Sequence, residues 1–300
     1  MQDKMNNKNI LILTNGYTGS KVLQKLHQLR LSPFVATSEH TDLRKKPCGD
    51  ILSYSKYFQI YEISSENYSV SKNILPKADI IICIDWKKDY FENEIVDCPV
   101  YYMQPSLLPK YRGYGAVSEQ FIRGVVYSGV TIYEYNGVID GGDIIYQQEI
   151  RVENYFKVSD LMDRQADVTA DFIASLYKGI DYSRRKQQEE YAFYLPKIRK
   201  NSKKIDFNAD ALSVYNFIRA YTFPFSGAVF YFKGEEYKIT DAALESWSGI
   251  EGRPGEIVAV NDYGIVAACG EGSVLIKEVE YNGQIMKSLM INIYDGEILI

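Results

Sequence analysis

The stretch ADIIICIDW, residues 78–86, carries the clearest structural signal in the sequence. Its apolar side chains follow one another without alternation, whereas a strand with one face in water would alternate apolar and polar residues. Such a run is typical of a strand that is covered on both faces. The stretch therefore predicts a central strand of a parallel sheet.

Further strands and helices alternate on either side of this run. Short apolar runs predict the strands, and apolar residues at helical spacing predict the helices between and after them. Strands that alternate with helices imply a parallel sheet with right-handed crossovers, which is an open α/β fold. The predicted elements are strands at residues 9–14, 34–37, 99–104 and 129–135 and helices at residues 20–30, 115–124 and 158–178.

The composition changes after about residue 183. Residues 184–204 hold eight basic and two acidic residues, a net charge of +6, with few apolar residues, which is typical of a solvated linker. From residue 227 onward, short β-branched runs are broken by glycine turns. The predicted organisation is an α/β domain over residues 1–183, a basic linker, and a small β domain, a partly open barrel, over residues 205–300.

Composition excludes several classes of protein. The 300 residues are 46% hydrophobic and 24% charged, unlike a disordered chain, a fibre or a disulfide-rich miniprotein. The first residues, MQDKMNNKNI, lack the apolar core of a signal peptide, and no apolar run approaches the roughly 20 residues of a membrane helix. The four cysteines form no CxxC pair, so no metal site is predicted. We expect a cytoplasmic protein with reduced cysteines.

Charge argues against a nucleic-acid partner. The formal net charge of the chain is −5. Residues 205–300 carry six Lys or Arg and fourteen Asp or Glu, a net charge of −8. Binding of nucleic acid requires several contacts between basic groups and phosphates. The β domain is therefore a poor platform for RNA.

Histidine is scarce and tyrosine abundant. The chain has 26 tyrosines but only two histidines, His27 and His40. His27 falls within the first predicted helix and His40 in a loop after the second predicted strand, so both are expected at the solvent edge. Chemistry that depends on histidine has few candidates here.

Two loops carry the candidate chemistry. PSLLPKYRG, residues 105–113, follows a predicted strand and lies at the carboxyl edge of the sheet, where open α/β folds bind ligands. GVIDGGDII, residues 137–145, places Asp140 and Asp143 on either side of a glycine pair. Glycine lets the backbone approach a ligand closely, so we expect Asp143 to enter the site beside it.

Together these loops resemble the signatures of the formyltransferase family, whose members use 10-formyltetrahydrofolate to formylate an amine. The family includes methionyl-tRNA formyltransferase and the sugar N-formyltransferases. The likeness covers nearly the whole chain, because residues 191–207 (YAFYLPKIRKNSKKIDF) are similar to the family's linker and residues 254–280 to its terminal β domain. It implies a Rossmann-like formyltransferase domain followed by an OB-like C-terminal domain.

The chain departs from the family at the catalytic tripeptide. The family has Asn-x-His directly before Pro-Ser-Leu-Leu-Pro, whereas this sequence has Tyr102-Met103-Gln104. Formyl transfer requires donors aimed at the formyl oxygen and a group that takes a proton from the amine. The resemblance implies that Gln104 offers an amide N–H, Tyr102 a phenol O–H, and Asp143 the base.

The resemblance also implies where the cofactor, 10-formyltetrahydrofolate, binds. The tryptophan that follows the central strand would stack on a flat ring, although packing in the core is an equally good interpretation, and Arg112 is expected to anchor its loop rather than contact ligand. The implied folate-binding residues are Asp85, Trp86, Ser106, Leu107, Leu108, Val138, Ile139, Asp140 and Gly141.

Two hypotheses of different classes remain open. In the first, the protein is a diverged formyltransferase that acts on a small amine, such as a nucleotide-linked amino sugar. In the second, it is a non-catalytic relative that keeps the fold and a ligand pocket and acts as a binding or partner protein. A methionyl-tRNA formyltransferase is disfavoured by the acidic β domain. The resemblance is compatible with a homodimer, as in relatives.

Overall fold

The structure is a computed structural model that describes residues 8–38, 50–64, 66–92, 94–196, 203–245 and 252–300. The chain forms two compact units. The first contains residues 1–116, 127–152 and 161–196, and the second contains residues 117–126, 153–160 and 197–300. His40, Cys48 and positions 197–202 of the predicted linker lie outside the described residues.

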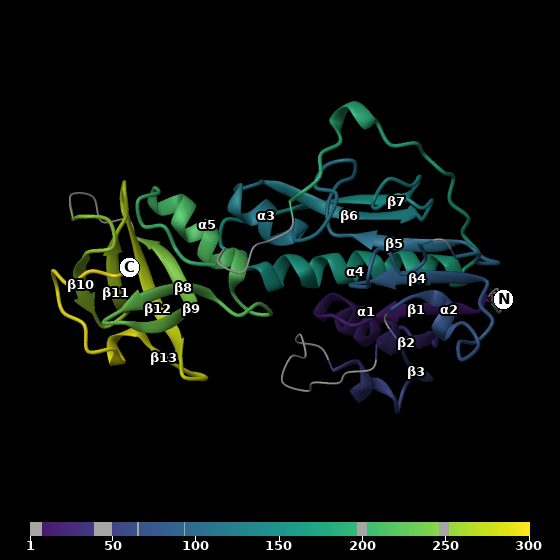
Figure 1. Cartoon of the computed structure of the whole chain (residues 1–300), viewed down its shortest axis with the longest axis horizontal. Helices are drawn as coiled ribbons and strands as arrows, with labels where there is room; N and C mark the ends of the chain where they lie inside the picture. Colours follow the sequence, from purple (N-terminus) through teal and green to yellow (C-terminus); the bar gives the residue numbers. More distant parts are fainter. Residues whose placement is uncertain (1–7, 39–49, 65, 93, 197–202, 246–251) are drawn as a thin grey trace. The chain divides into compact units, whose positions relative to one another are not determined.

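A seven-stranded sheet organises the first unit (Figure 1). Its order is β3-β2-β1-β4-β5-β6-β7. The first five strands in this order pair in parallel, and β6 pairs antiparallel with both β5 and β7. The prediction of a mostly parallel α/β sheet is confirmed. The strands are β1 (Ile10–Thr14), β2 (Phe34–Ser38), β3 (Ile60–Ile63), β4 (Ile80–Ile84), β5 (Val100–Gln104), β6 (Tyr127–Glu134) and β7 (Ile144–Arg151).

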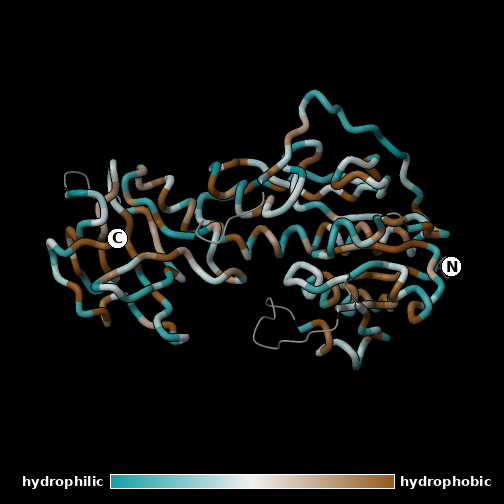
Figure 2. Tube along the Cα trace, in the orientation of Figure 1, coloured by the Kyte–Doolittle hydropathy of each residue, from teal (hydrophilic) through white to brown (hydrophobic). Residues whose placement is uncertain are grey.

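The central strand β4 is buried on both faces, as its sequence predicts. Ile80, Ile82 and Ile84 join a core with α1 (Tyr17–Gln28) and α4 (Val158–Tyr177). Ile81 and Cys83 join a second core, rich in aromatic rings, on the opposite face. The short helix α2 (Tyr68–Ser71) contributes to that face. Hydrophobic colour is accordingly concentrated along the strands in Figure 2, whereas residues 184–190 are hydrophilic.

The second unit is an antiparallel sheet with two helices, α3 (Ala116–Ile122) and α5 (Ala211–Tyr221). The sheet order is β10-β11-β12-β9-β8, and β13 also pairs with β12. The prediction of a separate C-terminal β domain is confirmed. Its strands are β8 (Ala228–Phe232), β9 (Glu235–Glu245), β10 (Ile257–Asn261), β11 (Gly264–Ala268), β12 (Ser273–Tyr281) and β13 (Gln284–Lys287).

The last residues of the chain join the two edges of this second sheet. On one side, Leu299 N donates to Gly255 O (2.8 Å), directly before β10. On the other side, Tyr231 of β8 and Ile300 exchange two hydrogen bonds, at 2.7 and 2.9 Å. The ring of hydrogen bonds from β10 to β8 is therefore closed through residues 297–300.

No helix in the described ranges is both long enough and apolar enough to span a bilayer.

Candidate functional site

A pocket of about 380 Å³ opens at the carboxyl ends of β4 and β5, within the first unit. It is lined by Cys83, by residues 85–88 directly after β4, by residues 102–105 at the end of β5, and by residues 113–116. This is the edge at which open α/β sheets bind ligands. The position therefore agrees with the one expected from the sequence.

Gln104, the last residue of β5, is held at both ends of its amide. Its Oε1 accepts a hydrogen bond from Nζ of Lys88 (2.6 Å), and its Nε2 donates to the carbonyl oxygen of Tyr111 (2.7 Å). A lysine ammonium can only donate, so the amide oxygen must face it. Gln104 is 1% exposed, and its orientation is thus fixed by the protein.

Lys88 is the buried cation of this pocket, with a side chain that is 11% exposed. Its Nζ donates to three acceptors: Gln104 Oε1, the carbonyl oxygen of Gly113 (2.7 Å) and Oδ2 of Asp140 (2.5 Å). Burial lowers the pKa of Lys88, while the neighbouring Asp140 acts in the opposite direction. The ammonium thus connects the strand residue Gln104 to the loop residue Asp140.

Asp140 is completely buried, in a left-handed turn with a φ of 53°. Besides Lys88, its carboxylate accepts hydrogen bonds from Gly113 N (2.7 Å) and from the hydroxyl of Tyr133 (2.8 Å). Burial, together with the charge of Asp140, raises the pKa of Tyr133 well above its ordinary value, so this phenol stays protonated and donates. The three donors come from three different segments of the chain.

Asp143, the carboxylate expected in the site, lies elsewhere. Its side chain forms an ion pair with Lys186 (2.9 Å), whose own side chain is 88% exposed. Its carbonyl oxygen accepts a hydrogen bond from Glu134 N (2.9 Å). The structure therefore brings Asp140, and not Asp143, to the pair formed by Gln104 and Lys88.

Tyr102 lies in the aromatic core beneath the pocket and is 2% exposed. Its ring is stacked against Tyr133, with 5.9 Å between ring centroids and 21° between the planes. Its hydroxyl donates to the carbonyl oxygen of Lys87 (2.9 Å). Burial raises the pKa of Tyr102 far above its ordinary value. The phenol O–H that the sequence offered as a donor to a ligand is thus engaged by the backbone.

The two predicted folate-binding residues after β4 have different surroundings. Oδ2 of Asp85 accepts hydrogen bonds from Thr18 N (2.9 Å) and Gly19 N (3.3 Å), so it caps the first turn of α1. Trp86 is 5% exposed, with its ring perpendicular to Tyr90 at 5.4 Å between centroids. Within the described residues, the buried indole N–H of Trp86 has no hydrogen-bond partner.

The predicted residues Ser106, Leu107 and Leu108 fix their loop to the sheet. The hydroxyl of Thr131 in β6 donates to Ser106 O (2.7 Å) and accepts from Leu108 N (3.1 Å). Leu107 packs so closely on Gly129 that a Cβ there would overlap its side chain. These three residues therefore position the loop, which meets the pocket at Pro105.

The remaining predicted residues form the turn before β7. Val138 is 50% exposed, and its carbonyl oxygen accepts a hydrogen bond from Gly141 N (3.2 Å). The carbonyl oxygen of Ile139 accepts from the hydroxyl of Tyr194 (3.4 Å). Of this turn, Asp140 is the residue whose side chain joins the network at the pocket.

Arg112 anchors its loop through hydrogen bonds, as the sequence predicts, and is 2% exposed. It forms a bidentate pair with Glu189 (2.8 and 2.6 Å) and donates to Oε1 of Gln187 (2.7 Å). Nε2 of Gln187 in turn donates to the carbonyl oxygens of Asp140 (2.8 Å) and Gly142 (2.6 Å). Arg112 and Gln187 therefore hold the two loops of the site together.

Gln187 and Glu189 belong to residues 184–195, which we call the strap. The sequence predicts a solvated linker here, but the strap belongs to the first unit. Arg112 N donates to Phe193 O (3.0 Å), and Leu195 N donates to Arg112 O (2.8 Å). The strap is therefore bonded to the loops of the site and is not a free tether.

Two sequence comparisons show the family of the chain. Residues 61–175 match the family described as "Formyl transferase", and residues 197–291 match "Formyl transferase, C-terminal domain". The methionyl-tRNA formyltransferase of Acetivibrio thermocellus is 30% identical over 212 residues, which make up 69% of this chain and 68% of that relative. The chain belongs to the formyltransferase family.

Solved structures share the formyltransferase fold. HypX from Aquifex aeolicus in complex with tetrahydrofolic acid superposes with a TM-score of 0.66 at 17% identity, covering 95% of this chain and 47% of HypX. An N-formyltransferase from Helicobacter canadensis, in complex with folinic acid and dTDP-3-aminofucose, gives a TM-score of 0.62 at 19% identity, covering 90% of this chain and 98% of that enzyme. At such identities the likeness concerns the fold.

The site of this family member contains two residues that sequence reasoning missed, Lys88 and Gln187. Lys88 stands four residues after the end of β4, and its only signal was its closeness to the carboxyl edge of a central strand. Gln187 stands within a basic run that has the composition of a linker. Neither residue forms part of a motif, so their roles follow only from the folded chain.

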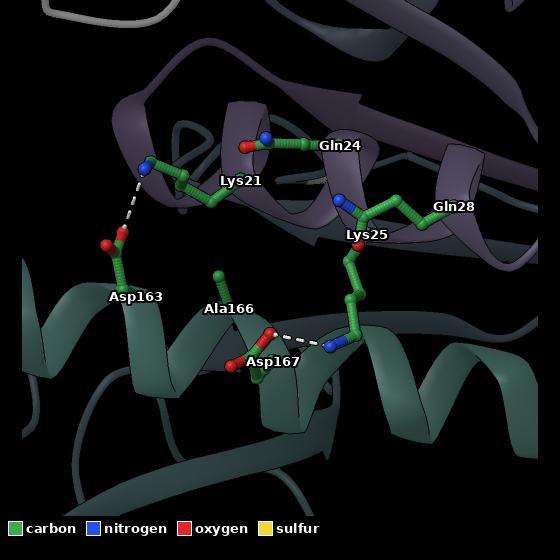
Figure 3. Close-up of a pocket in the computed structure, with 7 residues that line it drawn as sticks. All are labelled: Lys21, Gln24, Lys25, Gln28, Asp163, Ala166 and Asp167. Carbon is green, nitrogen blue, oxygen red and sulfur yellow. Dashed lines mark ion pairs between the residues drawn. The ribbon is translucent and has the colours of Figure 1, made fainter.

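A second pocket, of about 210 Å³, lies between α1 and α4 (Figure 3). Two ion pairs cross it, Lys21 with Asp163 (3.4 Å) and Lys25 with Asp167 (3.3 Å). Their side chains are 35% to 49% exposed, and such pairs contribute little to stability. This groove is a seam between two helices.

Proposed function

We propose that this protein transfers a formyl group from 10-formyltetrahydrofolate to the nitrogen of a small amine. The observation that carries the proposal is the meeting of Lys88, Gln104 and Asp140 at the pocket beyond β4 and β5. A buried titratable cluster in a pocket at this edge of an α/β sheet is a frequent mark of an active site.

The pocket fits a flat, polar ring such as the pterin of a folate. Trp86 is one of the residues that line it, and its indole N–H is a buried donor without a partner in the described residues. Buried donors are nearly always satisfied, so an acceptor atom of a ligand would complete this one. The side chains of Met103 and Pro105 add apolar surface nearby. In two similar structures the bound molecules are tetrahydrofolic acid and folinic acid.

When bound, the folate supplies a formyl group on nitrogen, which an amine takes up in exchange for one of its protons. The residues of the chain orient the reacting groups and hold a charge beside them. Gln104 presents an amide that Tyr111 and Lys88 hold in one orientation. Asp140, in place of the expected Asp143, is the carboxylate that faces this region, and it keeps the Lys88 ammonium beside the pocket.

We propose a small amine, such as a nucleotide-linked amino sugar, as the acceptor. The enzyme from Helicobacter canadensis was crystallised with such a sugar. The charge of residues 205–300, six basic against fourteen acidic groups, disfavours a tRNA acceptor, although the relative from Acetivibrio thermocellus is named methionyl-tRNA formyltransferase.

A second candidate function is a non-catalytic relative that binds folate. It is favoured by one observation: the polar groups that replace the family's asparagine and histidine are engaged inside the protein. The hydroxyl of Tyr102 donates to Lys87 O, and the amide of Gln104 is held between Lys88 and Tyr111. Such a protein would keep the pocket and release no tetrahydrofolate.

Binding and turnover measurements separate the two functions. Calorimetry with folinic acid tests the pocket, and incubation with 10-formyltetrahydrofolate and a panel of dTDP-linked amino sugars tests turnover through the release of tetrahydrofolate. We expect both binding and release. Binding without release from any acceptor would favour the non-catalytic function, and absence of binding would contradict both functions.

A matched pair of variants tests the pterin contact. Trp86→Phe removes the unpartnered N–H from a residue that lines the pocket, and we expect it to weaken folate binding about tenfold. Tyr90→Phe removes a hydroxyl from the same aromatic cluster. Because Tyr90 does not line the pocket, this variant should leave the affinity for folate unchanged. Equal effects of both variants would remove Trp86 from the proposed site.

A further inference from the structure

Lys88 is the strongest feature that the family resemblance leaves unexplained. It stands on the loop after β4 and is enclosed to 11% exposure, yet it borders the pocket. Its neighbour Lys87 is exposed and pairs with Asp89 (3.5 Å). A buried lysine is costly unless its charge has a use or a partner.

The surroundings of Lys88 select the charged ammonium. Asp140 is 0% exposed and lies 2.5 Å from Nζ, so a neutral amine would leave a buried carboxylate without its counter-ion. The other two acceptors, Gln104 Oε1 and Gly113 O, are neutral dipoles. An ammonium has three protons, one for each of these atoms. Lys88 is therefore a positive charge held at the wall of the pocket by Asp140.

Formyl transfer builds negative charge on the formyl oxygen as the amine adds, and a donor fixed at that oxygen lowers the barrier. Tyr102 cannot serve without giving up its bond to Lys87 O, because its phenol has a single proton. Lys88 can exchange one of its two neutral acceptors for the formyl oxygen and still keep its ion pair with Asp140. Such an exchange replaces one hydrogen bond by another.

We infer that Lys88 is the residue that binds the formyl oxygen of the folate donor, and that Gln104 and Asp140 are the positioning residues that aim its ammonium. This inference rests on the proposed function, since it concerns the same pocket and the same folate. It assigns to a lysine on the loop after β4 a positive charge that no residue of the altered Tyr-Met-Gln tripeptide carries.

The test measures how strongly the protein prefers a formylated folate, and it needs no acceptor. Calorimetry compares 10-formyl-5,8-dideazafolate, a stable analogue, with 5,8-dideazafolate itself. A hydrogen bond from a charged donor contributes a preference of about 10- to 100-fold. We expect this preference in the unaltered protein, its loss in Lys88→Met, and unchanged affinity for the analogue that lacks the formyl group.

Two further variants keep the test decisive. The double variant Lys88→Met with Asp140→Asn removes both charges of the pair, so it avoids an unpaired buried carboxylate if the single variant fails to fold. Lys110→Met removes an exposed lysine from the neighbouring loop and should retain the preference.

Each outcome has one meaning. If the unaltered protein binds neither analogue, the proposed function and the inference are both overturned. If it binds both analogues equally, or if the preference survives in the folded Lys88 variants, the inference is overturned and folate binding stands. If the preference disappears only when Lys88 is replaced, the inference is supported.

Discussion

Tyr102 shows how a residue at a catalytic position becomes part of the core. Its ring is surrounded by other aromatic rings, with Tyr133, Tyr135 and Phe91 at 5.9, 5.7 and 6.4 Å between centroids. An asparagine at this position would be smaller and polar. The substitution thus exchanges a small amide for apolar packing, and the hydroxyl of Tyr102 is satisfied by the backbone of Lys87.

We predict that Tyr102→Asn lowers the free energy of unfolding by about 3–5 kcal/mol, as removal of a large buried side chain does. Tyr102→Phe keeps the ring and loses one hydrogen bond, so its cost should be about 0.5–1.5 kcal/mol. Urea denaturation of both variants gives the comparison. Similar costs for the two would mean that the ring packs less tightly than its neighbours indicate.

The predicted cost of Tyr102→Asn also affects a variant that restores the family's tripeptide. Tyr102→Asn with Gln104→His adds the missing groups but opens a cavity and sets an imidazole against the Lys88 ammonium. We expect formyl transfer by the double variant only when it remains folded, so activity and urea stability are measured on the same preparation.

Cys269 is a buried thiol of the second unit, 4% exposed. Burial raises its pKa to about 12, so at pH 8 only about one thiol in 10⁴ is the reactive thiolate. In a Cys48→Ser background, we predict that iodoacetamide at pH 8 leaves Cys269 unlabelled until the protein is unfolded in urea. Peptide mass spectrometry detects the modification, and rapid labelling of the folded protein would contradict the prediction.

At the scale of elements, the turn between β6 and β7 sets the position of Asp140. Gly142 has no room for a side chain, because an added Cβ would overlap the carbonyl oxygen of Glu134. Gly137 in the same turn has a φ of 90° and nothing within 4 Å of an added Cβ. Glycine is therefore favoured at position 142 by the close contact and at position 137 by the backbone conformation.

We predict that Gly142→Ala displaces the turn and abolishes folate binding, because Asp140 and the acceptors of Gln187 move with it. Gly137→Ala should cost about 1–2 kcal/mol in backbone strain and retain binding. Calorimetry with folinic acid, with circular dichroism as the check of folding, distinguishes the two. Retained affinity in Gly142→Ala would show that the turn tolerates displacement.

The elements that the sequence predicts are those with an unambiguous pattern. The strands β1, β2, β4 and β5 consist mainly of apolar residues, so their burial can be predicted from the sequence. The edge strands β3 (IYEI) and β7 (IIYQQEIR) were missed, because each carries polar residues on its exposed side. An edge strand has one partner instead of two, and its sequence is correspondingly less constrained.

Part of the site could be predicted and part could not. The pocket's place at the sheet edge, Gln104 in its wall and the anchoring of Arg112 follow from order along the chain. The choice between Asp140 and Asp143 depends on the conformation of a turn with a left-handed aspartate, which spacing alone does not specify. Lys88 and the strap depend on contacts between segments far apart in sequence.

At the scale of the whole molecule, each unit is assembled from separated segments of chain. The strap carries Gln187 and Glu189 back to the loops of the first unit, so residues up to 196 complete that unit. The second unit depends on residues 297–300, which bond to both edges of its sheet. The composition of the sequence indicates neither the role of the strap in the first unit nor that of residues 297–300 in the second.

We predict that Leu299→Ala, which truncates a side chain that is 2% exposed, lowers the stability of the second unit by about 2–5 kcal/mol. Hydrogen exchange should then accelerate at the amides of Tyr231 and Ile300, while the amides of β1 and β4 keep their protection. Tyr263→Ala, at an exposed position of the same unit, is the control. Equal exchange in both variants would contradict the closing role of the terminal residues.

The closure of the second sheet by residues 297–300 also determines which unit can fold first during synthesis. During synthesis, the strands from β8 to β12 leave the ribosome before residues 297–300, so they lack the hydrogen bonds that these residues form with Tyr231 of β8, with Gly255 and with Ile257 of β10. Unpaired strand edges are templates for association with other chains. The first unit, by contrast, has all its segments once residue 196 has emerged. The unit that holds the pocket can therefore fold early, whereas the second unit keeps part of its strand edges unpaired until residues 297–300 have emerged.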